Sequence, residues 1–310
     1  MISIVVPIYN GAQFLDECVK SVLQQDCREW ELLLVDDGST DDTPQICQSY
    51  LKDGRIKYIW KENSGVQETR WCGISMAKYE YITFLDADDI LLPCTIGTLN
   101  KLLGQYDIIT FGMQTFSTTS EIEPVETAKD ISATFTDKTV IMKKILSGQM
   151  LSCVWGAAYK RKMLLGCRKL FCNGLKIGED TMFNTELAYA MSPSVAVLPS
   201  KMYCYRTNSN SVSHTYNHDR HYEVYRTIIY LEDFLQRNKL YHTLRSEAGF
   251  RILLLWSSFM FHPDNDFYRN KAIRHRMKRL YFTAFRYLYP YLKVYLFIDL
   301  FLLKIGERWK

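Results

Sequence analysis

The chain has 310 residues, 47% of them hydrophobic and 23% charged, which is enough for one large domain with an appendage or for two domains. It contains no low-complexity segment and no internal repeat, which argues against disordered and repeat proteins. The opening MISIVVPIYN lacks a basic segment and a cleavage site, so we expect a core strand there and not a signal peptide. Nine scattered cysteines without a CxxC pair predict reduced thiols in a cytosolic protein.

The net charge of +4 is unevenly distributed along the chain. Residues 1–95 carry 16 Asp/Glu and 8 Lys/Arg, whereas residues 221–310 carry 8 Asp/Glu and 16 Lys/Arg. We therefore expect the acidic part to hold cations and the basic part to meet an anionic surface.

The first 112 residues alternate between strand and helix signals. Uninterrupted apolar runs predict strands at 2–8, 31–35, 56–60, 81–85 and 107–112. Helical spacing and N-cap residues predict helices at about 14–23, 42–52 and 66–78. Continuous apolar strands separated by helices indicate an α/β fold, with a Rossmann-like, mostly parallel sheet flanked by helices. After about residue 220 the chain has the pattern of helices, and we place a domain boundary there.

A polar cluster follows each of the first four predicted strands. The clusters are YN at 9–10, DDGSTDD at 36–42, ENSG at 62–65 and DADD at 86–89. Because ligands bind beyond the carboxyl ends of the strands in such sheets, the four clusters predict one site at one edge.

Asp86 and Asp88 form a D-x-D pair whose side chains point the same way in extended geometry. Two carboxylates at a strand end suit Mg²⁺ or Mn²⁺, which take oxygen ligands and share them with substrate phosphates. The alternative is a turn whose acids cap the next helix, and Asp89 fits that role best.

Asp36 and Asp37 end the second predicted strand at the same edge, where a carboxylate can accept a hydrogen bond from a base or a ribose hydroxyl. Tyr9 offers a stacking face for a planar base, although simple packing is the alternative. Neither G-x-G-x-x-G nor G-x-x-x-x-G-K-[ST] occurs, so a diphosphate would need a metal and a few basic residues.

Five segments carry a family resemblance: SIVVPIYNGAQFLDECVKSVLQQ, ELLLVDDGSTDDT, ENSGVQETRWCG, YITFLDADD and, far downstream, GEDTMFN. In their order and spacing they resemble the family 2 inverting glycosyltransferases of the GT-A fold, over about residues 2–103 and more loosely over 150–213. The W-G pair at 155–156 and GEDTMFN resemble bacterial enzymes that build capsules, lipopolysaccharide or other surface glycans. The resemblance implies a catalytic domain at 1–220, with a nucleotide-binding half at 1–112 and an acceptor half at 113–220, before a helical region at 221–310.

The resemblance also implies roles on the donor side. Tyr9 and Asp37 match the positions that hold a uracil base, and Pro7 opens the same turn. Arg70 matches a basic residue near the nucleotide. The segment YCYRTNSNSVSH at 203–214 is similar to one that closes over the diphosphate, with Arg206, Ser211 and His214 as candidates.

On the catalytic side, Asp86 matches a position near the ribose and Asp88 the metal ligand, so both are candidate ligands of the cation. Asp180 in GED matches the catalytic base. Glu179 beside it either raises the pKa of Asp180 or caps the following helix, and we group it with the substrate-binding candidates. One departure is Trp71, which stands where the family usually has Asn; burial in a helix is its expected role.

The implied reaction moves a hexosyl or N-acetylhexosaminyl group from a UDP-sugar to an acceptor hydroxyl. A divalent cation at Asp88 offsets charge on the departing diphosphate, and Asp180 takes the proton of the attacking hydroxyl in a single inverting displacement. One alternative is a non-catalytic scaffold that binds a glycan or nucleotide. Another is a phosphohydrolase of the haloacid dehalogenase type, although its D-x-D follows the first strand.

The C-terminal part is basic and aromatic. Residues 269–279 hold six Lys/Arg, and the next thirty hold ten aromatic residues and the run VYLFIDLFLL, which Asp299 interrupts and which is short for a membrane span. We expect peripheral attachment to the cytoplasmic face of the cell membrane, where a glycan or polyprenyl-diphosphate-linked acceptor is extended. A helical subdomain packed on the sheet is the alternative, and no motif for nucleic acid accompanies the charge.

Overall fold

The computed structural model describes residues 1–125, 130–172, 174–207 and 220–260. They fall into two compact units. The first contains 1–142, 150–174 and 180–215, and the second contains 143–149, 175–179 and the chain from 216 onward. The division into domains at residue 220 stays a prediction.

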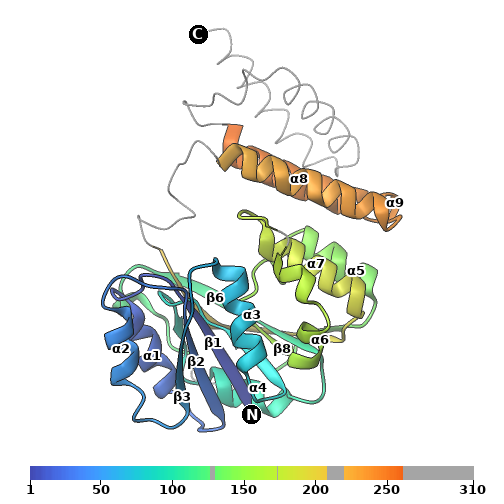
Figure 1. Cartoon of the computed structure of the whole chain (residues 1–310). Coiled ribbons are helices and arrows are strands. Elements are labelled where there is room, and N and C mark those ends of the chain that lie inside the picture. The colour runs from blue at the N-terminus through green and yellow to red at the C-terminus, as the bar shows by residue number, and fades with distance from the viewer. Residues whose placement is uncertain (126–129, 173, 208–219, 261–310) are drawn as a thin grey trace. The chain divides into compact units, whose positions relative to one another are not determined.

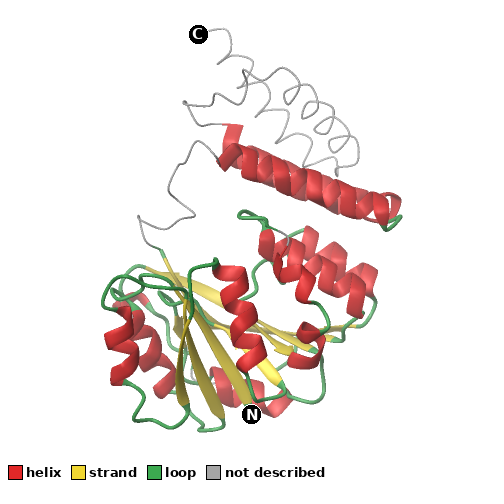
Figure 2. Cartoon of the chain, viewed as in Figure 1, coloured by secondary structure: helices red, strands yellow, loops and turns green. Residues whose placement is uncertain are grey.

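In the described part of the chain, nine strands form one sheet. The strands are β1 (Ile2–Ile8), β2 (Trp30–Asp36), β3 (Ile56–Trp60), β4 (Tyr81–Phe84), β5 (Ile90–Leu91), β6 (Ile108–Phe116), β7 (Ala133–Phe135), β8 (Ala157–Lys160) and β9 (Val195–Arg206). Their order across the sheet is β3-β2-β1-β4-β8-β6-β9-β5, and β7 pairs with β9. Figure 1 labels several of these strands, and Figure 2 shows the sheet with helices against it.

Helices connect most of these strands. The first unit contains α1 (Leu15–Leu23), α2 (Thr43–Ser49), α3 (Val66–Met76), α4 (Thr95–Leu102), α6 (Arg161–Leu165) and the short 3₁₀ helices η1 (Thr119–Glu121) and η2 (Arg168–Cys172). Two helices, α5 (Lys138–Leu146) and α7 (Glu179–Met191), have residues in both units. The second unit contains α8 (Arg220–Arg237) and α9 (Tyr241–Met260).

The first four long strands, β3-β2-β1-β4, are all parallel, as their apolar sequences predict. The remaining half of the sheet is mixed. There β8 runs antiparallel to β4 and β6, whereas β6 and β9 are parallel. The predicted α/β fold with helices on its faces is confirmed, and the departures from parallel order all lie after β4.

Alternating residues of β1 serve the two faces of the sheet. Ile4 and Val6 belong to a buried cluster with Leu15 and Val19 of α1. Val5 points to the other face and meets α3. The helices α1 and α2 therefore cover one face and α3 the other, as right-handed crossovers require when the strand order reverses at β1 (Figure 1).

Within the second unit, Arg251 of α9 links two segments that are distant in sequence. Its side chain is buried, and its guanidinium donates to the backbone oxygens of Ile145 at 2.8 Å and Leu146 at 3.1 Å. These are the last carbonyls of α5, where a cation is favourable. No helix in the described ranges is both long and apolar enough to span a membrane. The basic run at 269–279 and the apolar run after it lie outside the described residues.

We expect Gly73→Ala to destabilise the protein because α3 lies so close to β1. A Cβ at Gly73 would lie 2.3 Å from Cγ1 of Val5, which is fully buried. Overpacking of this kind costs about 1–3 kcal/mol of unfolding free energy, measurable by urea denaturation. The double variant Val5→Ala/Gly73→Ala should recover part of that loss. Equal costs of Gly73→Ala in the wild-type and Val5→Ala backgrounds would contradict the close contact.

Candidate active site

The loops after β1 and β2 are bound to each other at the carboxyl edge of the sheet. The amides of Asn10 and Gly11 donate to the hydroxyls of Ser39 at 2.9 Å and Thr43 at 3.0 Å. The amide of Ala12 donates to Asp41 at 3.0 Å. Since β1 to β4 are parallel, the loops after β3 and β4 end at this same edge, and the four polar clusters lie together as predicted.

Asp36 and Asp37 are both buried by partners in these loops. Asp36 accepts from the amide of Ser39 at 2.8 Å and the hydroxyl of Tyr58 at 2.6 Å. Asp37 binds the Lys61 ammonium and accepts from the amides of Ser64 at 2.9 Å and Gly65 at 2.8 Å. Both carboxylates therefore hold nearby loop and strand residues together at the carboxyl edge of the sheet.

Burial alone would raise the pKa of Asp37. The Lys61 ammonium and the donated amide hydrogens outweigh burial, so the pKa of Asp37 lies below the ordinary value of an aspartate. The carboxylate is therefore charged at neutral pH, which suits an acceptor of hydrogen bonds.

The aromatic side chain of Tyr9 is 57% exposed, next to these carboxylates. Pro7, by contrast, is buried within β1. Only the segment Ile2–Val5 of β1 pairs with β4, so the amide hydrogen that Pro7 lacks costs no hydrogen bond to β4. Trp60, at the end of β3, is also 57% exposed. Sequence reasoning missed Trp60; its position as the last strand residue was the available signal.

The loop at 86–89 brings three carboxylates to the end of β4. Asp89 is fully buried and accepts from the hydroxyl of Tyr203 at 2.5 Å and the amide of Arg206 at 2.7 Å. The expectation that Asp89 caps a helix is wrong. The chain continues into β5, which pairs with β9, and the carboxylate binds β9 instead.

Arg206 lies behind this loop. Its Nε donates to the backbone oxygen of Asp88 at 2.7 Å, and its Nη2 pairs with Glu17 at 2.6 Å. The guanidinium also lies 4.4 Å from the ring centres of Phe14 and Phe116. With 6% of the residue exposed, Arg206 supports the loop from within the protein. Ser211 and His214, the other candidates of this segment, lie outside the described residues.

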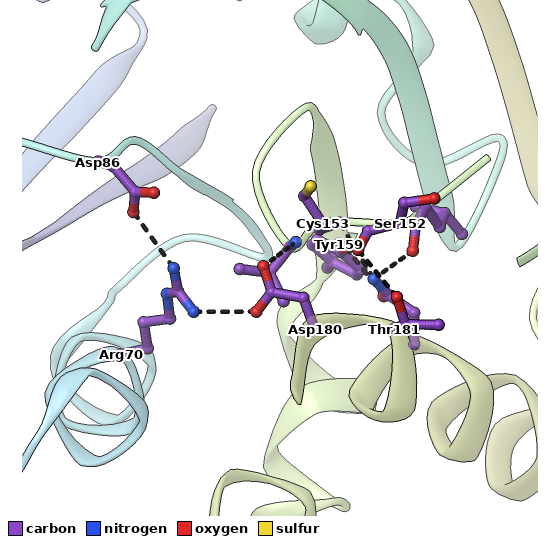
Figure 3. Close-up of polar contacts among 10 residues, drawn as sticks. Arg70, Asp86, Ser152, Cys153, Tyr159, Asp180 and Thr181 are labelled. Carbon is purple, nitrogen blue, oxygen red and sulfur yellow. Dashed lines mark hydrogen bonds and ion pairs between the residues drawn. The ribbon is translucent and has the colours of Figure 1, made fainter. Parts of the chain in front are cut away.

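Arg70 joins two of the predicted site carboxylates. Its Nη1 lies 3.1 Å from Oδ1 of Asp180, and its Nη2 lies 3.2 Å from Oδ1 of Asp86 (Figure 3). The Arg70 side chain is 7% exposed, and those of Asp180 and Asp86 are 17% and 27% exposed. The structure therefore brings the predicted base, the first aspartate of the D-x-D and Arg70 into one cluster.

Three polar residues in the first turns of α7, all within the motif GEDTMFN, contact the loop 151–154. Oδ2 of Asp180 accepts from the amide of Val154 at 3.2 Å, and the Thr181 hydroxyl donates to the oxygen of Ser152 at 3.2 Å. One turn later, Asn184 donates to the oxygens of Leu151 at 2.9 Å and Cys153 at 3.1 Å. These residues fasten the loop 151–154 to the helix. Asn184 was missed, although its place four residues after Asp180 puts it on the same helical face.

Trp71, the departure from the family pattern, is half-buried and packs beside Phe171 of η2 at 5.6 Å between ring centres. Phe171 in turn lies 4.6 Å from Phe183 of α7. The neighbours Arg70 and Trp71 thus both connect α3 to α7, one by charge and one by aromatic packing.

Burial and neighbouring charges change the pKa values of two carboxylates at this site. Burial and the charge of Asp86 raise the pKa of Asp180, while Arg70 acts in the opposite direction. Burial and Asp86 also raise the pKa of Asp88. A carboxylate with a raised pKa is a better proton acceptor at neutral pH, which is the property a general base needs.

The residues present fit a hard divalent cation that shares its ligands with a substrate. No group of three or more His, Cys, Asp or Glu side chains forms a metal site of its own in the described ranges. Asp88 and Asp86 offer carboxylate oxygens at the edge of the sheet, and the repulsion between them, which raises the pKa of Asp88, would be relieved by a cation. Mg²⁺ and Mn²⁺ commonly bind through one or two carboxylates together with substrate phosphates.

The chain belongs to glycosyl transferase family 2, whose model matches residues 3–165. The resemblance in the sequence motifs is thereby confirmed.

Two curated relatives come from Bacillus subtilis (strain 168). The uncharacterized glycosyltransferase EpsJ is 30% identical over 69% of this chain and 63% of its own length. The minor teichoic acid biosynthesis protein GgaA is 30% identical over 66% of this chain and 47% of its own length. The chain thus spans about half to two thirds of these two relatives.

Two solved structures share the fold. The crystal structure of S. aureus TarS 1-349 in complex with UDP-GlcNAc has a TM-score of 0.62 at 21% identity, over 92% of this chain and 79% of that one. The mannosyltransferase PcManGT from Pyrobaculum calidifontis, in complex with GDP-Man and Mn²⁺, has a TM-score of 0.51 at 14% identity, over 91% of this chain and 85% of that one. The predicted GT-A fold is confirmed.

We expect Asp37→Asn to lower the unfolding free energy at neutral pH by about 1–3 kcal/mol, because the buried loop donors lose a charged acceptor. The pKa of Asp37 is depressed in the fold, so its contribution is present above the unfolded pKa and is lost as the pH falls through the folded pKa. Urea titrations should show the difference from wild type shrinking below about pH 4. The matched control is Asp42→Asn, an exposed acid of the same cluster. A difference that is independent of pH would contradict the assignment.

Proposed function

We propose that this protein is an inverting glycosyltransferase. It moves a sugar from a nucleotide-sugar, with UDP as the carrier, to a hydroxyl of a glycan or a polyprenyl-diphosphate-linked acceptor in bacterial surface polysaccharide synthesis. The observation that carries the proposal is the position of Asp180, beside Asp86 at the carboxyl edge of the sheet and joined to it by Arg70. A proton acceptor thus faces the edge where the donor would bind.

The donor side of the proposal uses the edge of the sheet. Tyr9 stacks on the base, Asp37 accepts from it, and Asp86 lies near the ribose. Asp88, together with Asp86, holds a Mn²⁺ or Mg²⁺ ion. When bound, this ion offsets the negative charge that develops on the departing diphosphate.

Asp180 accepts the proton of the acceptor hydroxyl as the oxygen attacks the anomeric carbon. Its raised pKa and its hydrogen bond from Val154 support this role, because the amide orients the carboxylate while burial increases its basicity. The bond between the anomeric carbon and the diphosphate breaks on the opposite side, so a single displacement inverts the configuration. Glu179 and Arg206 remain candidate substrate contacts, with Ser211 and His214.

The comparisons support a surface polymer and a nucleotide-sugar. GgaA is named for minor teichoic acid biosynthesis, TarS was solved with UDP-GlcNAc, and PcManGT was solved with GDP-Man and Mn²⁺. We prefer UDP to GDP as the carrier for two reasons. TarS, which was solved with UDP-GlcNAc, has a higher TM-score than PcManGT, which was solved with GDP-Man. Tyr9 and Asp37 also match the family positions that hold a uracil base.

The catalytic test is Asp180→Asn, measured as UDP release from a panel of UDP-sugars in the presence of Mn²⁺. We expect turnover to fall by on the order of 100-fold or more while UDP still raises the melting temperature. Asp88→Asn should instead remove the Mn²⁺-dependent part of that stabilisation. Normal transfer by Asp88→Asn, with UDP binding that is indifferent to the cation, would sink the proposal.

Two alternative functions, a binding scaffold and a phosphohydrolase, would give different experimental results. A nucleotide- or glycan-binding scaffold would bind UDP-sugars and turn over none of them. A phosphohydrolase of the haloacid dehalogenase type would form a phospho-aspartate at Asp86. Here the D-x-D follows β4 rather than the first strand, and Asp86 is paired with Arg70, which argues against a free nucleophile.

The proposal includes peripheral attachment to the inner face of the cell membrane through the basic, aromatic region from 269 onward, which would place the active site near a lipid-linked acceptor. Replacing the six Lys/Arg of 269–279 by Gln should weaken binding to anionic vesicles by about 1 kcal/mol for each residue that lies near the surface. Sedimentation with phosphatidylglycerol vesicles measures this, with neutral phosphatidylcholine vesicles as the control. Unchanged sedimentation of the variant would contradict it.

A further inference from the structure

Arg70 extends from α3 to two carboxylates that arrive from different parts of the chain. Asp86 follows β4, and Asp180 stands in the first turn of α7, 110 residues further along the chain from Arg70. Each carboxylate contacts a different Nη nitrogen of the guanidinium (Figure 3). The planar fork of an arginine offers a separate nitrogen to each acid, whereas a lysine presents a single point charge.

We propose that Arg70 is a positioning residue for Asp180, fixing the carboxylate of the base at the donor edge and tying it to Asp86 through one guanidinium. This inference rests on the proposed function. It differs from the role that the sequence suggested for Arg70, which was contact with the nucleotide.

The packing around Arg70 supports a positioning role. The next residue, the half-buried Trp71, contacts Phe171, and Phe171 contacts Phe183 one turn after Asp180, so aromatic packing also connects α3 to α7. The amide of Val154 holds the second oxygen of Asp180. Two donors from two directions leave the carboxylate little rotational freedom.

The charges around Asp180 show what Arg70 contributes. The charge of Asp86 acts on this carboxylate, and burial and Asp180 raise the pKa of the buried Tyr159 hydroxyl. Glu179 is the neighbour of Asp180 in the chain. Cys153 lies in the loop that α7 binds. Burial and Asp86 both favour the protonated, inactive form of Asp180, and Arg70 opposes them. Without Arg70 the carboxylate of Asp180 would lose one of its two donors and the charge that opposes the rise in its pKa.

The test compares Arg70→Gln and Arg70→Lys with wild type. Arg70→Gln should lower kcat at neutral pH by at least roughly tenfold, with UDP affinity unchanged. The acid limb of its kcat profile should move up by about 1–3 pH units, the effect of removing an opposite charge from a carboxylate. Arg70→Lys keeps the charge and should restore the wild-type acid limb and part of kcat.

The matched control is Arg161→Gln. The Arg161 guanidinium also binds α3, donating to the backbone oxygens of Ile74 at 2.9 Å and Ser75 at 3.0 Å, but it contacts the far end of that helix. We expect it to lower the melting temperature without moving the pH profile. If Arg70→Gln behaves in the same way, Arg70 is merely structural. If it weakens UDP binding and leaves the acid limb in place, Arg70 is a nucleotide contact. Either result overturns the inference.

A second readout needs no donor, acceptor or cation. The ¹³C signal of the Asp180 carboxyl carbon, assigned by comparison with Asp180→Asn, should titrate at higher pH in Arg70→Gln than in wild type. An unchanged midpoint overturns the inference. This titration remains informative if no sugar nucleotide is turned over, in which case the proposed function fails and the link between Arg70 and Asp180 is judged separately.

Discussion

The crowding of three carboxylates within four residues, Asp89 buried and Asp86 and Asp88 half-buried, is the constraint around which the first unit is arranged. Like charges at the end of an apolar strand repel each other, and burial adds to the cost. Two buried arginines offset this from different elements: Arg70 of α3 binds Asp86, and Arg206 of β9 binds the loop at the backbone oxygen of Asp88. Asp89 is held by Tyr203 and by the amide of Arg206. For the carboxylate of Asp88, burial and the charge of Asp86 raise the pKa.

This arrangement makes the site dependent on parts of the chain that are far apart. The loop at 86–89 is incomplete until β9 has paired with β5 and β6, because β9 carries both Tyr203 and Arg206. Trp155 stacks on Tyr203 with ring centres 4.6 Å apart, so the loop that α7 holds also contacts this strand. The carboxyl edge of the sheet and the position of Asp180 therefore both depend on long-range contacts, and neither is determined by residues 1–112 alone.

The sequence was most informative where a local rule decides the structure. The strands β1 to β4 were predicted to within about a residue because both faces of a parallel sheet are buried and their apolar runs are continuous. Their shared edge follows from the parallel direction. Local rules could not predict that Asp89 binds Tyr203 or that Arg70 binds Asp180, because each of these partners lies more than 100 residues away in sequence. The two-residue strand β5 could not be predicted from the sequence either, because its pairing with β9 makes it a strand and its composition does not. For the same reason Asp89 was mistaken for a helix cap.

The segment RWCG shows how one helix can set the geometry of a site. The helix α3 begins at the carboxyl edge of the sheet and runs back along β1 and β2. Gly73 lies against Val5, which is paired in register with Phe84, two residues before Asp86. Arg70 stands three residues before Gly73, hence about one turn nearer the edge and on the same side of the helix. The absence of a side chain at Gly73 lets α3 approach the sheet, and this approach brings the Arg70 guanidinium level with Asp86. Trp71, pointing away from this face, fixes α7 at the distance at which Asp180 meets the same guanidinium.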